Sequence, residues 1–98
     1  MYCPDNWVIV KITHPEEVVY KILAGWSGGY LYGDSWRMNS GIVRASTEGD
    51  CTLFYGSSGS VYKCHKDHQR LSNITAGIYE ALVKQGKDVK VEIVDEFV

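Results

Sequence analysis

Hydrophobic and polar residues alternate in short runs as far as residue 64, and turns containing glycine or proline separate the runs. Residues 7–13 (WVIVKIT) and 18–23 (VVYKIL) are rich in β-branched side chains and flank a turn at Pro15, so they predict a β-hairpin. Residues 56–59 (GSSG) are a second hairpin signal. The other predicted strands are 41–46, 51–55 and 60–64, with short pieces at 30–32 and 35–37.

The period of the apolar positions changes after residue 70, from two to between three and four. The new stripe consists of Leu71, Ile74, Ile78, Ala81 and Leu82. It predicts an amphipathic helix of about three to four turns, with Ser72 as its N-cap and Gly86 just beyond its end. Residues 89–93 then alternate between apolar and charged side chains, which predicts a final half-buried strand.

A run of strands followed by one helix and one strand is typical of an α+β fold. We expect a small antiparallel β-sheet of about five to six strands, with one C-terminal helix packed on one face and a last strand after it. The 98 residues suffice for a single compact domain, 1–98, with one modest core but not two.

The composition excludes several classes of protein. With 45% hydrophobic and 22% charged residues, the chain resembles a soluble globular domain, and its net charge of −2 makes nucleic acid an unexpected partner. No apolar run approaches the ~20 residues that cross a bilayer, and the first residues lack the pattern of a secretion signal, so no membrane partner is expected. Three cysteines without a disulfide framework suit a reducing cytosol, so we expect a cytoplasmic protein.

The segment GWSGG, residues 25–29, matches the G-x-S-x-G pattern of a hydrolase nucleophile, and GDSW, residues 33–36, contains another esterase signature. A triad can be written from Ser27, Asp34 and His65 or His68. The hydrolase motif needs a helix after the serine, however, whereas Ser27 is followed by glycines and strand formers. We therefore interpret Gly28 and Gly29 as turn residues with positive φ, and we expect no catalysis.

The glycine-rich segment 25–41 is a long connection for so small a domain, and such connections are often functional. Its aromatic side chains offer faces on which a base or ring can stack. Arg37 offers a planar fork for phosphate or carboxylate, and the Asn39 amide offers both a donor and an acceptor. This segment is the predicted surface for a small, anionic, partly aromatic ligand, with nucleotides as the first class.

Two further segments add to that surface. The backbone amides of the tip 57–60 are a candidate anion nest. The densest cationic run, residues 63–70, follows the tip in the sequence, and we expect it to lie beside the tip and to supply Lys66. The full set of predicted ligand-binding residues is Trp26, Tyr30, Tyr32, Asp34, Trp36, Arg37, Asn39, Ser58 and Lys66.

Three side chains that bind zinc in other proteins, Cys64, His65 and His68, lie within five residues. Their spacing fits no zinc-finger class, because adjacent residues of a strand point to opposite faces. We therefore expect no metal and no cofactor.

The blocks GWSGGYLYGDSWRMNSGI (25–42) and GSSGSVYKCHK (56–66) resemble those of small uncharacterised proteins from bacterial and phage genomes. The resemblance brings no activity and no site residue with it. It implies a small stand-alone protein of a kind that sequesters a molecule or blocks a host enzyme.

Three hypotheses follow. The first is a non-catalytic binding protein for a small anionic, nucleotide-like ligand. The second is an interaction protein that inhibits a host protein by direct contact, for which a surface rich in Trp, Tyr and Arg is equally suited. The third is a small hydrolase or a zinc-stabilised domain. An exposed edge strand or aromatic loop would also allow a homodimer.

Overall fold

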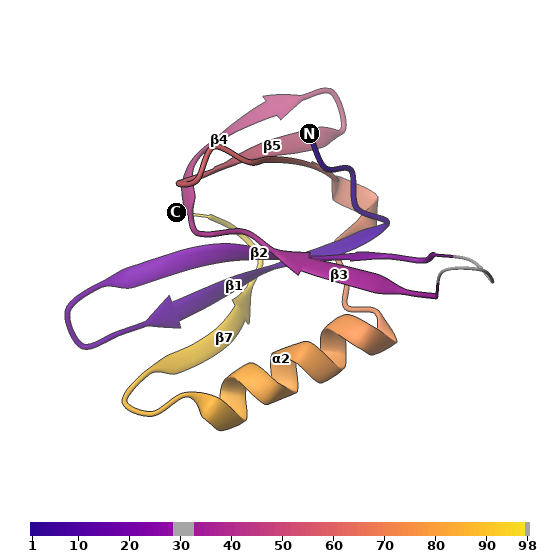
Figure 1. Ribbon diagram of the computed structural model, residues 1–98. Coiled ribbons are helices and arrows are strands. Elements are labelled where there is room, and N and C mark those ends of the chain that lie inside the picture. The colour runs from indigo at the N-terminus through magenta and orange to yellow at the C-terminus, as the bar shows by residue number, and fades with distance from the viewer. Residues whose placement is uncertain (29–32, 98) are drawn as a thin grey trace.

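The computed structural model describes residues 1–28 and 33–97 and shows an α+β fold of three layers (Figure 1). One antiparallel sheet has the order β3-β2-β1-β7 and the other the order β4-β5-β6. In Figure 1 the three-stranded sheet lies above the four-stranded sheet and helix α2 lies below it. The elements are β1 (Asn6–Thr13), β2 (Val18–Trp26), β3 (Ser35–Met38), β4 (Ile42–Glu48), β5 (Cys51–Gly56), β6 (Val61–His65), the 3-10 helix η1 (Lys66–His68), α2 (Asn73–Gln85) and β7 (Lys90–Val94).

The α+β class and the predicted strands and helix are confirmed for the described residues, but a single sheet of five to six strands is wrong. Seven described strands divide into sheets of four and three. Both expected hairpins are present, with Thr13 opposite Val18 in one and Tyr55 opposite Val61 in the other. The strand piece predicted at 30–32 lies outside the described residues.

The four-stranded sheet is buried on both faces. Trp7 and Ile9 of β1 belong to a cluster between the two sheets, whereas Val8 and Val10 belong to a cluster that α2 covers. This arrangement explains the uninterrupted apolar run of β1, because both sets of alternating side chains are buried. The expectation of only one modest core is therefore wrong.

Helix α2 begins with the predicted cap. Thr75 donates its backbone N–H to the Ser72 hydroxyl over 3.2 Å, and Ser72 donates its own N–H to the Thr75 hydroxyl over 2.8 Å. Two details differ from the prediction. Ala81 is exposed rather than part of the buried stripe, and Gly86 caps the helix with a φ of −70°, so it does not use the left-handed conformation. Within the described residues, no helix is both long and apolar enough to cross a bilayer.

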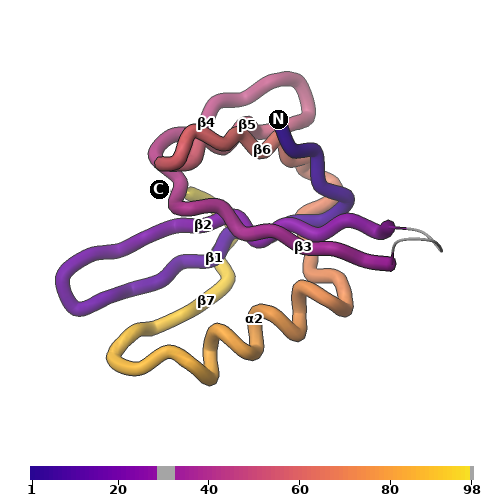
Figure 2. The backbone as a smooth tube through the Cα atoms, viewed as in Figure 1, coloured from indigo at the N-terminus to yellow at the C-terminus, as the bar shows by residue number. Residues whose placement is uncertain are grey.

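The chain passes from one sheet to the other directly after β3. Gly41, with a φ of +149°, allows this crossing, and Ile42 begins β4. The N-terminal segment also joins the second sheet, because Tyr2 forms a parallel bridge with Tyr62 of β6. Figure 2 shows the N-terminal segment passing from the three-stranded sheet to β1. The two connections bring the N-terminal segment, the end of β3 and the 56–60 turn to one region.

Candidate functional site

The site is built around the end of β3, where side chains alternate between the two faces of its sheet. Arg37 pairs with Ala24, which lies in the cluster between the sheets, and Trp36 pairs with Gly25. Arg37 therefore projects toward the three-stranded sheet, and Trp36, which is 44% exposed, projects to the opposite face. The sequence prediction places these neighbours on one surface; their side chains leave β3 on opposite faces, although both residues line the same hollow at this edge of the sheet.

Arg37 lies over an aromatic stack. Its guanidinium carbon is 4.6 Å from the ring centroid of Tyr2, and the Tyr2 ring is 5.0 Å from that of Tyr62. Trp26 packs edge-on against Tyr2 at 6.2 Å, and its indole N–H donates to the carbonyl oxygen of Cys3 over 3.0 Å. The hydrogen bond fixes the orientation of the half-buried indole, so Trp26 presents a preformed aromatic wall.

Tyr62 is 1% exposed, and burial raises the pKa of its hydroxyl, although the positive charge of Arg37 acts in the opposite direction. The hydroxyl is protonated at neutral pH even at the ordinary tyrosine value, and the upward shift of its pKa extends this state to higher pH. Tyr62 can therefore donate a hydrogen bond to an anion.

Asn39 continues the pairing of β3 with β2 through its side chain. Its backbone N–H donates to the Ile22 carbonyl oxygen over 3.1 Å, and its Oδ1 accepts the Ile22 N–H over 2.8 Å. Asn39 is 4% exposed, and its Nδ2 has no hydrogen-bond partner in the described part of the chain. A buried amide donor of this kind is unfavourable unless an acceptor reaches it.

The 56–60 turn packs against Ser40. The Ser40 hydroxyl accepts from the Ser57 hydroxyl over 2.8 Å and from the Ser58 N–H over 3.0 Å. The Ser57 N–H donates to the Gly41 carbonyl oxygen and the Gly59 N–H donates to that of Gly56. The expected anion nest is therefore not supported, because acceptors of the protein itself already occupy the amides of Ser57, Ser58 and Gly59. The turn contributes hydroxyl groups instead.

These residues line two adjoining hollows. The first, of about 460 Å³, is called here the basic hollow, and its lining is Tyr2, Lys21, Arg37, Met38, Asn39, Ser40, Ser58, Ser60 and Tyr62. The second, of about 270 Å³, is the aromatic hollow, lined by Tyr2, Trp26, Ser35, Trp36 and Arg37. Tyr2 and Arg37 belong to both, so the two hollows are continuous. Within residues 1–28 and 33–97, no acidic residue lines either of them.

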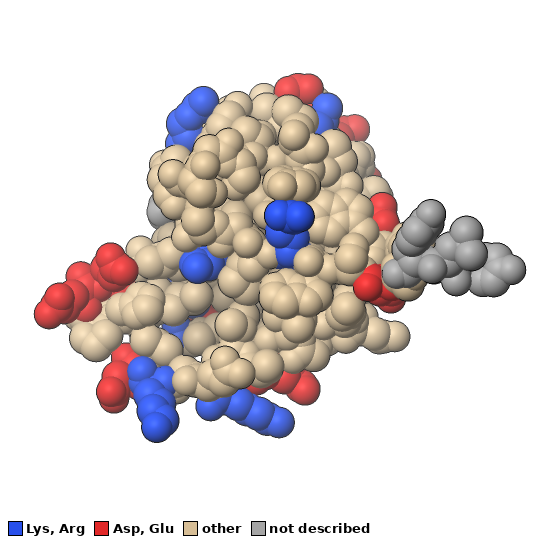
Figure 3. Space-filling model, in the orientation of Figure 1, with Lys and Arg blue, Asp and Glu red and all other residues tan. Residues whose placement is uncertain are grey.

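The charge distribution agrees with this description. The chain as a whole has a net charge of −2, yet Lys21 and Arg37 take part in no ion pair among the described residues. Figure 3 shows basic atoms amid uncharged ones in the middle of the face that carries β3, with acidic side chains toward its rim. The basic hollow is therefore locally positive.

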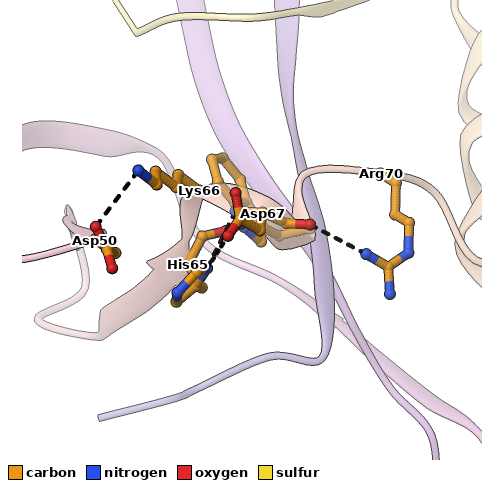
Figure 4. A network of polar contacts seen from close by, with 6 residues as sticks. Asp50, His65, Lys66, Asp67 and Arg70 are labelled. Atoms are coloured by element: carbon orange, nitrogen blue, oxygen red, sulfur yellow. Dashed lines mark hydrogen bonds and ion pairs between the residues drawn. The ribbon is translucent and has the colours of Figure 1, made fainter.

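Lys66 does not join this site. It forms an ion pair with Asp50 at 3.4 Å, within a polar network at the start of η1 that also contains His65, Asp67 and Arg70 (Figure 4). Strand β6 separates Lys66 from the 56–60 turn, and five extended residues span roughly 16 Å. Proximity in the sequence was therefore a poor guide to the position of the cationic run.

The structure assigns no role in the site to three other predicted residues. Tyr30 and Tyr32 lie outside the described residues. Asp34 is exposed, and no ion pair joins it to Arg37 among the described side chains. Arg37 contacts the Tyr2 ring instead.

The hydrolase pattern has a structural explanation. The backbone N–H of Ser27 donates to Asp5 Oδ2 over 2.8 Å, and a Cβ at Gly28 would collide with the backbone carbonyl of Gly33. Gly28 is thus required by close backbone approach and not by positive φ, and Gly29 lies outside the described residues. No group of three or more His, Cys, Asp or Glu side chains within the described ranges is arranged to hold a metal ion.

The sequence prediction missed Tyr2, Lys21 and Tyr62, which line the hollows but lie outside the segments predicted to form the binding surface. Tyr2 reaches the site through the parallel bridge to β6, and no local pattern signals such a bridge. Lys21 interrupts the apolar run of β2, and a charged residue in an otherwise apolar strand was the one available signal. Comparison with known protein families, curated proteins and solved structures gives no match for this chain.

Proposed function

We propose that this protein binds a small anionic ligand that carries an aromatic group, such as a nucleotide, in the basic and aromatic hollows. The observation that carries the proposal is that Lys21 and Arg37 both line a hollow whose described lining contains no acidic residue, in a chain whose net charge is negative. A locally positive hollow attracts anions and raises their concentration beside the protein.

The other lining groups favour an anion as well. Asn39 Nδ2 lacks an acceptor, and the hydroxyls of Tyr62 and Ser58 can donate. A buried donor without a partner costs about 1–3 kcal/mol, and part of this cost is recovered when a ligand oxygen accepts its hydrogen. Nδ2 is buried beneath the lining of the hollow, so an oxyanion relieves this cost only if the neighbouring side chains move to expose it.

The aromatic hollow provides for the uncharged part of the ligand. Trp26 and Tyr2 are held in place by their contacts with Cys3 and Arg37 before any ligand arrives. A base stacked on such a side chain gains about 1–3 kcal/mol. Preorganised rings lose little conformational entropy on binding, which favours affinity.

The test begins with native mass spectrometry of protein purified gently from its expression host, which detects a retained small molecule. Tryptophan fluorescence and calorimetric titrations with ribonucleotides then measure affinity. Arg37→Ala should weaken binding at least tenfold, because a hydrogen bond to a charged group contributes about 1.5–3 kcal/mol. Arg44→Ala is the matched control, since Arg44 also lies over a tyrosine ring, at 3.7 Å from Tyr55, but lines neither hollow. Equal effects of the two variants would contradict the proposal.

A second candidate function, contact with a host protein, is favoured by one observation. Trp36 is 44% exposed on β3, which forms an edge of its sheet, and aromatic side chains at such edges are frequent interaction hot spots. Trp36→Ala should then abolish binding of the partner, and because Trp36 also lines the aromatic hollow it should weaken nucleotide binding as well. Lys21→Ala, at a residue that lines only the basic hollow, should weaken nucleotide binding and leave partner binding unchanged, so this variant separates the two functions.

A further inference from the structure

We propose that the ligand carries a terminal phosphomonoester, and that this group occupies the basic hollow. The inference rests on the proposed function and narrows its ligand class to nucleoside monophosphates and molecules of similar build. It excludes nucleosides, cyclic nucleotides and carboxylates as the preferred ligands.

Charge balance is the first argument. The basic hollow contains two cationic side chains, Lys21 and Arg37, and no acidic lining residue in the described ranges. A phosphomonoester carries a charge of about −1.5 to −2 at pH 7, and a phosphodiester or a carboxylate carries about −1. The doubly charged group therefore neutralises the hollow, and a singly charged group leaves one cation without a counter-charge.

The arrangement of donors is the second argument. Arg37 approaches from the face of its sheet that meets the three-stranded sheet, and Lys21 belongs to the opposite face, since its neighbour Ile22 lies between the sheets. The Ser58 and Ser60 hydroxyls come from the turn of the other sheet. Donors from several directions suit the three diverging terminal oxygens of a phosphate, whereas a planar carboxylate needs donors on one side.

The unpaired amide of Asn39 supplies the third argument. Its Oδ1 is held by the Ile22 N–H at 2.8 Å, so the side chain cannot rotate without losing a buried hydrogen bond. The Nδ2 is consequently fixed as a donor that is buried just beneath the lining of the hollow. A ligand rich in acceptor oxygens satisfies it when the lining side chains move apart, and neither a water-excluding apolar group nor a cation does.

The shared lining of the two hollows places the rest of the ligand. Arg37 and Tyr2 belong to both, so an aromatic ring joined to the phosphate by a short linker comes to lie in the aromatic hollow beside Trp26. A nucleoside 5′-monophosphate has this build. Its base stacks while its phosphate faces Lys21.

The test compares matched ligands on the intact protein. For each common ribonucleoside, affinity is measured by calorimetry at low salt for the nucleoside, its 5′-monophosphate and its 3′,5′-cyclic phosphate, and inorganic phosphate is added as competitor. The 5′-monophosphate of at least one base should bind at least tenfold more tightly than its cyclic form, and inorganic phosphate should displace it. Because no histidine or carboxyl group lines the basic hollow in the described ranges, lowering the pH from 7.5 to 5 should weaken binding through protonation of the phosphate, whose second pKa is about 6.

Lys21→Ala and Arg37→Ala should each remove the preference for the monophosphate. Lys11→Ala is the matched control, because Lys11 lies over the Tyr20 ring at 5.9 Å and lines neither hollow. A cyclic nucleotide that binds as tightly as the monophosphate, or a preference that survives Arg37→Ala, overturns this inference and leaves the proposed function standing. If the folded protein binds none of these ligands at millimolar concentration, both the inference and the proposed function fail.

Discussion

The replacement Asn39→Ala tests whether the amide at the end of β3 both holds the fold and shapes the basic hollow. In the native protein, Asn39 Oδ1 accepts the N–H of Ile22, a residue that is 0% exposed. Alanine leaves this N–H buried without an acceptor, at a cost of about 1–3 kcal/mol. Removal of the unpaired Nδ2 offsets part of that cost, so we expect a net loss of about 2 kcal/mol in the free energy of unfolding.

Urea denaturation followed by circular dichroism measures this loss, and in a domain of this size ~2 kcal/mol corresponds to a fall in Tm of roughly 10 °C. Asn73→Ala is the matched control, because Asn73 is an exposed first residue of α2 and its loss should change stability by less than ~0.5 kcal/mol. If Asn39→Ala and Asn73→Ala have the same stability, the Ile22 N–H does not depend on Asn39 and the reasoning is refuted.

A second replacement at the same position separates structure from binding. Asn39→Asp keeps an oxygen that can accept the Ile22 N–H, but it replaces the unpaired donor by an oxygen and adds negative charge beside Arg37. Anion binding should be lost even in preparations that remain folded. Retention of full affinity by folded Asn39→Asp would show that the amide donor plays no part in binding.

Four further predictions concern other parts of the protein. Burial raises the pKa of the Cys64 thiol, so at pH 8 a thiol reagent should label exposed Cys3 much faster than Cys64, and urea should remove the difference. Burial also raises the pKa of the Tyr62 hydroxyl above its ordinary value of 10.0. The stability that the protonated hydroxyl contributes is therefore complete below pH 10 and is lost at higher pH. Tyr62→Phe should reduce this loss when the free energy of unfolding is measured by urea titration at several pH values. Ser72→Ala should cost about 1 kcal/mol of stability, because it removes the N-cap of α2, and an unchanged urea midpoint would contradict this. In Gly56→Ala the new Cβ would lie 2.7 Å from the Ser60 hydroxyl, so displacement of that hydroxyl should weaken phosphate binding in calorimetry while far-UV circular dichroism stays unchanged.

Local sequence patterns predicted most of the secondary structure because each element carries its own signal. The alternation in β6 matches its buried Tyr62 and Cys64, and the Ser72 cap marks the start of α2 within one residue. The division into two sheets has no such local signal. Which strands pair depends on contacts between segments that are distant in the sequence. At Gly41 the sequence contains only an ordinary turn signal, so nothing in it shows that the chain passes from one sheet to the other there.

The candidate site was predicted in part for the same reason. Arg37, Asn39 and Ser58 were chosen for their chemistry, and the fold brings all three to one hollow. Lys66 was chosen because it follows Ser58 closely in the sequence, but an extended strand carries it away from the hollow. The residue types were enough to predict which chemical groups the site uses. Which of these residues lie close together depends on how the strands pair, and the sequence does not reveal that pairing.

The position of the hollow follows from the way β3 ends. The strand β3 ends at Met38, and although the Asn39 N–H still donates to the Ile22 carbonyl oxygen, it is the Asn39 side chain that accepts the Ile22 N–H in place of a backbone carbonyl. A side chain that replaces the backbone in this way leaves its second polar atom, Nδ2, without a strand partner. The chain then turns away to the other sheet at Gly41, and the hollow that opens at this junction is lined by Asn39, Arg37 and the serines, with Nδ2 buried beneath its surface. The same interruption that divides the protein into two sheets thus creates a donor-lined hollow, and it is for this reason that the proposed binding site lies at the junction and not on either sheet face.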